Sequence, residues 1–454
     1  MPSLLILVGA SLLATPPAPA QINDGKPDPE FAVPEALDLP YALAFALDNN
    51  FTIRQAKERI KQQEGIVLEV RSAQIPKLTA SGSAQQVRLG ALGLTNDSQA
   101  WGISLSATQV LFAGGGVRSN IRSAQLAREA AVLDFRAVLN AALLDVRTRF
   151  YTVLLSREKI KVQEQNVGLL QRQLQDVKNR YEAGTVSNFE VLRAEVALAN
   201  ARTPLITARN DHRLAVEELR QALGFVTANE PDVTKVPEFV GTLDFKPASF
   251  ELRSALVTAR EHRPDLQRLL KLTAAGEQAV VTARSGYFPA VSAVATWQRS
   301  KSPSAFFKTG PVESWTAGVQ SQWNIFDGRA RAGRVAQARS LLEQTKLTVA
   351  EAQLNVDVDV RRAISTFQQA TELAEASKKV VAQAEEAVRL AHARFGAGTA
   401  TQLDVLTSQV DLTTARLNQL QAFYSYNVAV ANVRRAMGLA DELQPVGELP
   451  WPPK

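Results

Sequence analysis

The chain has 454 residues, no cysteine, three histidines and a formal net charge of +6. The absence of cysteine excludes a disulfide framework and a cysteine-based metal site, and the isolated His212, His262 and His392 have no metal-ligand spacing. The mild positive charge is spread along predicted helices, which favours solvated helix faces over a nucleic-acid-binding patch.

The first twenty residues have the pattern of a secretory signal peptide. An apolar run covers residues 4–14, and Ala18-Pro19-Ala20 supplies an A-x-A cleavage site before Gln21. The segment departs from the usual pattern because no Lys or Arg precedes the apolar run. We expect residues 1–20 to direct export, with a disordered apolar leader as the alternative. No cysteine follows the site, which excludes a lipoprotein-type anchor.

Two helices are predicted after the extended, Pro- and Asp-rich segment that follows. They cover about 40–49 and 52–73, and the second ends before Pro76. It ends there because a proline disfavours the α conformation of the residue that precedes it.

The repeat of apolar residues then changes from the spacing of a helix to every second residue. Between about 77 and 112, apolar and polar residues alternate on both sides of a polar, glycine-bearing loop at 88–99. Trp101 and Leu105 share the apolar face, whereas Ser104 belongs to the polar one. Such alternation predicts a strand pair with one apolar and one polar face.

A long helical hairpin is predicted next, at 118–223. Its first helix, at about 118–180, carries an apolar residue every seven positions: Val132, Leu139, Val146, Val153, Ile160, Val167, Leu174 and Tyr181. A heptad stripe of that length is typical of a coiled coil. The return helix is expected from Ser187 to Leu223, with a kink at Pro204.

The same order of elements returns after an irregular connector at 225–250. A second strand pair is expected at about 290–326, with Val319 on the apolar face and Gln320 on the polar face. A second long hairpin is expected at 330–438, followed by a non-periodic tail at 439–454. The second hairpin has its own apolar stripe, which includes Phe367 and Phe395.

The strands fit a membrane better than a soluble sandwich. Their length of about 9–11 residues suits a tilted membrane strand. Trp101, Trp297 and Trp315 lie beside the loops of the strand pairs, so they are expected at one level, and Trp323 lies at the opposite end of its strand. This is the layout of two aromatic girdles. Four strands cannot close a barrel, so the chain must oligomerise to satisfy its strand edges.

The two hairpins have matching turns. Residues 180–192 read RYEAGTVSNFEVL, and residues 394–406 read RFGAGTATQLDVL. In both, a glycine that can adopt positive φ ends one helix, at Gly184 and at Gly398. Trp101 and Trp315 keep the same spacing of 214 positions, which indicates a duplication with repeats at 21–224 and 251–438.

Together the paired R-[YF]-x-A-G-T turns, the two amphipathic strand pairs and the duplication resemble the TolC family of outer-membrane efflux proteins. The resemblance covers the whole chain after the signal peptide. It implies an α+β membrane protein and a homotrimer, with a 12-stranded β-barrel continued by a long α-helical barrel of coiled-coil hairpins. It also implies a passive exit duct in outer-membrane lipid, docked to a periplasmic adaptor and an inner-membrane transporter, with no cofactor.

The resemblance also implies roles for the hairpin turns. The tips around Gly184, Thr185, Gly398 and Thr399 are expected to meet the adaptor. The family has acidic residues after the second turn at the narrow end of the tunnel, and Asp404 matches the first of them. The second position is Thr407, and Phe395 and Ala400 replace the family's latching Tyr and Arg.

Glu190 is the equivalent of Asp404 in the first repeat. A structural role competes for both acids. Ser187 and Glu190 have capping-box spacing, and Thr401 and Asp404 imitate it.

No enzyme motif competes with a channel. The run Ala113-Gly114-Gly115-Gly116 precedes a helix but lacks the Lys and Ser/Thr of a phosphate-binding loop. The alternatives that remain are a membrane-anchored coiled-coil fibre or adhesin, and a passive porin. A fibre would not need its helices to return, and a porin would not need an adaptor.

Overall fold

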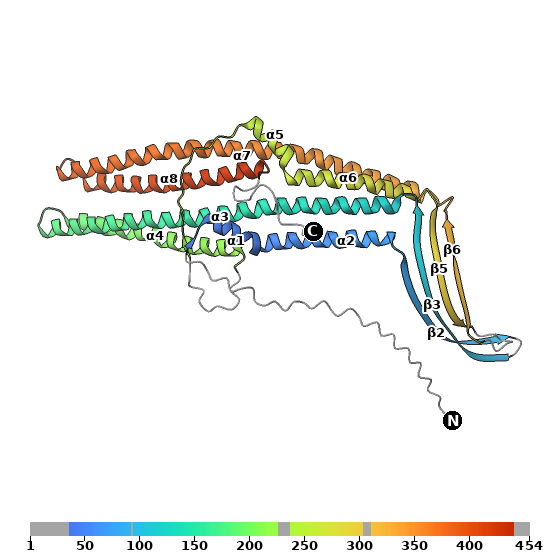
Figure 1. Cartoon of the computed structure of the whole chain (residues 1–454). Helices are drawn as coiled ribbons and strands as arrows, with labels where there is room; N and C mark the ends of the chain where they lie inside the picture. The colour runs from blue at the N-terminus through green and yellow to red at the C-terminus, as the bar shows by residue number, and fades with distance from the viewer. Residues whose placement is uncertain (1–35, 92–93, 226–236, 303–309, 440–454) are drawn as a thin grey trace, which may run out of the picture.

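The computed structural model describes residues 36–91, 94–225, 237–302 and 310–439. It has the shape of a long rod, with a bundle of helices that ends in a four-stranded sheet (Figure 1). The expected signal peptide, the Pro-rich end of the tail and the tip of the second strand loop lie outside the described residues.

Two helices of 67 residues form the length of the rod. They are α3 (Gly116–Glu182) and α7 (Ala330–Gly396), each roughly 100 Å long at ~1.5 Å per residue. Each returns through a short turn into α4 (Asn188–Leu223) or α8 (Gln402–Ala436). The structure therefore has a helical hairpin in each of the ranges predicted, 118–223 and 330–438. Pro204 lies inside α4, which continues through it as one helix.

Two shorter helices fill the half of the bundle next to the sheet. They are α2 (Phe51–Arg71) and α6 (Pro264–Ser285), and each begins where a return helix ends. Asn50 Nδ2 donates to the carbonyl of Ala222 over 2.6 Å, which joins the start of α2 to the end of α4. A Cβ on Gly224 would lie 2.4 Å from the Asn49 carbonyl oxygen.

The second repeat is joined in the same way. Gly438, at the end of α8, has φ +73°, and a Cβ there would lie 2.8 Å from Arg263 Cα at the start of α6. Each repeat thus has one continuous long helix and one composite helix made of two pieces end to end. The duplication in the sequence includes both Gly224 and Gly438. It does not indicate that these glycines pack against the starts of α2 and α6.

The heptad stripes are the core of the bundle. Leu139, Val146 and Val153 of α3 are almost fully buried, together with Val360, Phe367 and Ala374 of α7. Burial of such side chains stabilises by about 1.5–3 kcal/mol each. Tyr181, the last residue of the first stripe, is exposed at the tip.

Short elements surround the middle of the rod. α1 (Leu39–Asn49) packs on α3 and is capped by Asp38, whose carboxylate accepts from the Tyr41 N–H over 2.9 Å. α5 (Leu252–His262) packs on α7. The two-residue strands β1 (Ala36–Leu37) and β4 (Glu238–Phe239) pair in parallel within an otherwise irregular connector.

The sheet contains β2 (Lys77–Ala91), β3 (Leu94–Ala113), β5 (Ala290–Lys301) and β6 (Val312–Gln322) in the order β2-β3-β5-β6. All neighbours are antiparallel. The predicted loop at 88–99 is wrong, because backbone pairing continues to Ala91 and Leu94. The alternation of apolar and polar residues stops in this segment, but the backbone hydrogen bonds between two strands do not depend on side-chain alternation. β6 ends four residues before the predicted 326.

Candidate functional site: the sheet faces and the hairpin tips

The sheet separates apolar from polar side chains across all four strands. The register aligns Ala80, Leu105, Trp297 and Trp315 in one row on the apolar face. The large members of this face are exposed in the protomer, with Trp315 at 76% and Val319 at 68%. A continuous apolar face left open on a folded chain indicates contact with lipid or a partner.

The opposite face of the sheet is lined by hydroxyl and amide groups. Thr79, Ser106, Thr296 and Thr316 form a row across the four strands. Ser81 and Ser104 share a hydrogen bond of 2.7 Å between their hydroxyls. Gln320, paired with Ser292, belongs to this face, as predicted. The arrangement suits water on one side and lipid on the other.

A bulge in β3 keeps the faces separate near the helices. The register shifts between Val110 and Phe112, so one extra residue, Leu111, has no opposite partner. Phe112 therefore returns to the apolar face, opposite Val291. A bulge of this kind re-aims the side chains beyond it.

The tryptophans mark the ends of the apolar face. Trp297 and Trp315 are cross-strand partners, and Trp297 Nε1 donates to Glu313 Oε1 over 2.9 Å. The expectation that Trp101 lies at their level is wrong. Trp101 pairs with Lys301, four positions farther toward the loop, or about 13 Å along the strand. Sequence distance from a loop did not reveal this offset because the two loops differ in length.

Trp323 lies just beyond the opposite end of β6. Its Nε1 donates to the carbonyl of Tyr287 over 3.2 Å. Ile325 and Phe326 follow it and are exposed at 79% and 84%. The apolar band therefore ends at the joint where the strands meet α6 and α7.

The two hairpin tips have identical backbone geometry. Gly184 and Gly398 have φ +69° and +72°, and each is surrounded by open space. The N–H of Thr185 donates to the carbonyl of Arg180, and that of Thr399 to the carbonyl of Arg394, both over 2.9 Å. These bonds define a Schellman motif. Both threonine hydroxyls donate to the same carbonyls.

One contact between the two tips had no signal in the sequence. The Arg180 guanidinium lies over the Phe395 ring, 5.1 Å from its centroid, and thereby connects the first hairpin to the second. Phe395 is the position for which the resemblance implies a latching Tyr. A phenyl ring has no hydroxyl, but its face attracts a cation.

Asp404 closes a capping box at the start of α8. Its Oδ2 accepts the Thr401 N–H over 2.8 Å, and its own N–H donates to Thr401 Oγ1 over 3.3 Å. The Thr401 N–H, then the Thr401 hydroxyl and the charge of Arg394 hold the pKa of Asp404 below its usual range. The side chain is exposed.

The surroundings of Glu190 differ from the capping box of Asp404. Ser187 is the N-cap residue of α4, but its side chain makes no capping hydrogen bond, so the capping box proposed for Ser187 and Glu190 is wrong. Glu190 Oε2 is instead buried without a hydrogen-bond partner among the described residues. The two tips are therefore alike in backbone but differ in the chemistry of their acids.

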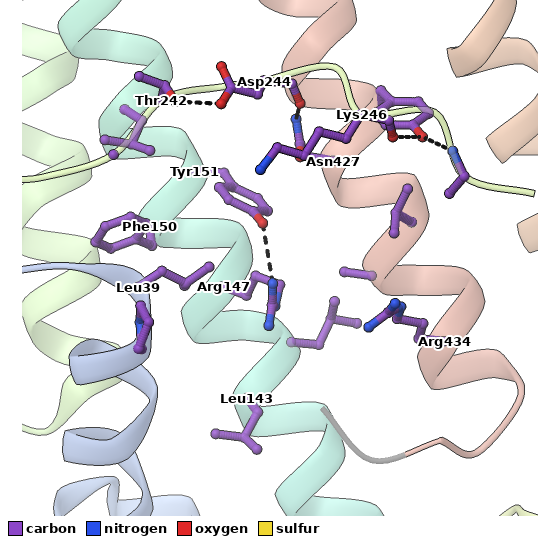
Figure 2. A pocket seen from close by; sticks show the side chains of 18 of the residues that line it. Leu39, Leu143, Arg147, Phe150, Tyr151, Thr242, Asp244, Lys246, Asn427 and Arg434 are labelled. Atoms are coloured by element: carbon purple, nitrogen blue, oxygen red, sulfur yellow. Dashed lines mark hydrogen bonds between the residues drawn. The ribbon is translucent and has the colours of Figure 1, made fainter. Parts of the chain in front are cut away.

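A cavity of about 670 Å³ lies at the middle of the rod, between α1, α3, the connector and α8 (Figure 2). It is lined by the basic residues Arg147, Lys246, Arg434 and Arg435 and by the acids Asp38 and Asp244. Asn427 Nδ2 donates to the Asp244 carbonyl over 3.1 Å and holds the connector against α8. The cavity reaches the end of α8, where Arg434, Arg435 and Leu439 line it.

Among the residues that the structure describes, no helix has both the length and the apolar character needed to cross a membrane.

Comparisons with known proteins agree with this geometry. The family model described as "Outer membrane efflux protein" matches residues 43–225 and 255–439. The chain is 27% identical over 416 residues to Protein CyaE of Bordetella pertussis, covering 89% of this chain and 85% of that one. It is 24% identical to Outer membrane protein TolC of Escherichia coli, covering 76% and 71%.

The CmeC outer membrane channel of Campylobacter jejuni has the same fold, with a TM-score of 0.77 at 15% identity and with 88% and 85% of the two chains covered. The chain therefore belongs to the outer membrane efflux protein family: it is a homotrimeric outer-membrane channel with a large periplasmic part, the exit duct of a tripartite efflux system completed by a periplasmic adaptor and an inner-membrane transporter.

Proposed function

We propose that three copies of this chain close one twelve-stranded barrel, which acts as a passive duct without enzyme activity. The observation that carries this proposal is the pair of open edges. No described segment pairs with the outer edge of β2 or of β6. Unpaired backbone groups in lipid cost several kcal/mol each, so each β2 must pair with β6 of a neighbour.

The polar face of the sheet then lines the pore. The row of hydroxyls at Thr79, Ser106, Thr296 and Thr316 faces water, and the row that ends at Trp297 and Trp315 faces lipid. Hydroxyl and amide groups can solvate a passing molecule without holding it. This chemistry supports passage rather than catalysis or tight binding.

The hairpin tips form the docking end of the duct. They lie at the end of the rod opposite the sheet (Figure 1). Exposed apolar residues stand beside both turns at equivalent positions, Phe189 and Leu403. Such residues favour contact with a partner. The glycines Gly184 and Gly398 shape the turns, and Thr185 and Thr399 brace them, so we assign docking to the surface around these residues.

The docking proposal is tested by adding bulk at the tips without changing the turns. Ala183 and Ala397 are exposed C-cap residues with negative φ, so the double variant Ala183→Arg/Ala397→Arg leaves both glycine turns intact. We expect normal trimers in the outer membrane, at least about tenfold less export and loss of crosslinking to the adaptor, because 1.4 kcal/mol of lost contact is a factor of ten.

The matched control is Ala183→Ser/Ala397→Ser, which changes the same positions with little added volume. It should export normally. Normal export and adaptor crosslinking by the arginine variant would contradict docking at the tips. Export that continues in a strain without the adaptor would favour a porin.

A further inference from the structure

A shallow basic groove lies directly below the sheet, between α6 and α7. It has a volume of about 420 Å³ and is lined by Arg284, Tyr287, Phe288, Ala332, Val335, Ala336 and Arg339. Two arginines thus share a concave site with two aromatic rings and small apolar side chains.

The guanidinium groups of Arg284 and Arg339 have no counter-charge among the residues that the structure describes. Neither the Arg284 nor the Arg339 side chain forms an ion pair or hydrogen bond with any residue in the described ranges. Both side chains are exposed. This distinguishes them from nearby Arg331 and Arg334, which both contact Asp327.

Arg331 holds the walls of the groove in place. It is 8% exposed and donates to the carbonyls of Gly286 over 3.2 Å and Ile325 over 3.0 Å. Its guanidinium also lies over the Tyr287 ring, 5.2 Å from the centroid. One side chain therefore ties the end of α6 to the chain that enters α7, and the groove is formed before any ligand binds.

The groove lies on the side of α7 that also contacts α5. Arg339 precedes Asp357 by 18 residues, which is five turns of helix, so both lie on the same side of α7. Asp357 pairs with Arg260 of α5, which lies beyond α7 on the side away from α3 (Figure 1). A ligand can reach the groove from the exposed surface of the protomer, because Arg284 and Arg339 are both exposed.

The groove also lies at the depth of lipid head groups. The exposed apolar band ends at Trp323, Ile325 and Phe326, at the joint between β6 and α7. Arg284 is one residue from the end of α6 at the same joint. Aromatic residues mark the interface of a membrane barrel, and cations just beyond them meet the phosphates.

We propose that this groove binds the head group of an anionic phospholipid in the periplasm-facing leaflet of the outer membrane. Arg284 and Arg339 take the phosphate, Tyr287 and Phe288 cover the glycerol, and the acyl chains run along Ile325 and Phe326. A homotrimer has three such sites. They anchor the helices to the leaflet at the point where the duct leaves the membrane.

The test is native mass spectrometry of the intact trimer in detergent, titrated with phosphatidylglycerol. Phosphatidylcholine with the same acyl chains tests the need for negative charge, and glycerol 3-phosphate tests a free phosphate. We expect up to three phosphatidylglycerol molecules per trimer and much weaker binding of the other two. Arg284→Gln/Arg339→Gln should raise the Kd for phosphatidylglycerol about 30-fold, given two lost cation–phosphate contacts.

Arg334→Gln is the matched control, because Arg334 is also exposed but does not line the groove. It should leave the Kd unchanged, and the same spectra show whether each variant is a trimer. Equal binding of phosphatidylglycerol by the wild type and the double variant would overturn the proposal. So would binding of glycerol 3-phosphate as tight as that of the lipid, which would identify a free-phosphate site.

Discussion

Two roles are predicted for the carboxylate of Asp404, a helix cap and a gate. Its capping box with Thr401 stabilises the first turn of α8, and its exposed position leaves the charge open to solvent. In a trimer, three such carboxylates at the docking end would surround the mouth of the duct, where their fields add. The structural role predicted for Asp404 is thus confirmed in the protomer, and the gate role remains a prediction.

We predict that multivalent cations block the duct through Asp404. In planar bilayers, hexaamminecobalt(III) on the periplasmic side should block the wild type at a concentration about tenfold lower than Asp404→Asn. Glu190→Gln serves as the comparison, because one Glu190 oxygen is already buried, and it should behave like the wild type. Equal block of all three proteins would leave Asp404 as a helix cap only.

The pH dependence of this block follows from the lowered pKa of Asp404. A depressed pKa means that the charged, capping form persists below the usual carboxyl value of ~3.9 and is lost only as the pH falls through the lower value. Crowding of three carboxylates acts in the opposite direction, but the Thr401 hydrogen bonds oppose it. We therefore expect block of the wild type to persist from pH 7 to 5, and its loss by pH 5 would show that crowding dominates.

At the scale of single residues, spacing in the sequence predicted only contacts between residues a few positions apart. Thr401 and Asp404 are three residues apart, so their capping box was visible as a pattern. Arg180 and Phe395 are 215 positions apart, and nothing in their local sequence indicates that they meet. Arg331 was missed for a similar reason, since the equivalent residue of the first repeat is Val117.

At the scale of elements, period and length identified α1, α2, the helices of both hairpins and the four strands of the large sheet. Heptads predicted α3 to within two residues at each end, the second hairpin was predicted to begin at residue 330, where α7 begins, and alternation predicted both strand pairs. Strand register was less accessible, because alternation fixes the face of a residue but not its partner. The offset of Trp101 from the level of Trp297 and Trp315, and the bulge at Leu111, both depend on the register between β3 and β5. Helices α5 and α6 carried no pattern that we recognised apart from the duplication.

The faces of β6 lead to a paired substitution. Val319→Arg should place a charge in lipid near mid-membrane and destabilise the barrel by about 2–4 kcal/mol, whereas Gln320→Arg should face water and cost little. The measurement is the fraction of trimer that survives increasing urea on a semi-native gel. If neighbouring residues 319 and 320 respond alike, the assignment of lipid and water faces is wrong.

At the scale of the whole molecule, the duplication explains why the two repeats are built from the same kinds of helices. Each repeat has one helix of 67 residues and one composite helix joined end to end, at Gly224 in the first repeat and Gly438 in the second. The sequence predicted the repeats and their hairpins. The joins depend on contacts between segments more than 170 positions apart, which periodicity does not encode.

The protomer is incomplete at this scale, because its sheet has two open edges. Closure between neighbours can be measured directly, since the chain has no native cysteine to interfere. Ser81→Cys on the polar face of β2 is combined with a single cysteine on β6, at Thr316, Gly318 or Gln320 on the polar face or at Val319 on the apolar face. Facing residues of adjacent strands bring their Cβ atoms to about 4.5–5.5 Å, close enough for a disulfide after small adjustments.

After oxidation of intact cells, the outer-membrane protein is separated on a non-reducing gel. At least one polar-face combination should give covalent dimers and trimers, and the Val319→Cys combination should stay monomeric, because its sulfur lies on the other side of the sheet. Monomers from every polar-face combination, or crosslinking through Val319→Cys as readily as through the others, would contradict a barrel closed by β2 and β6 of neighbouring subunits.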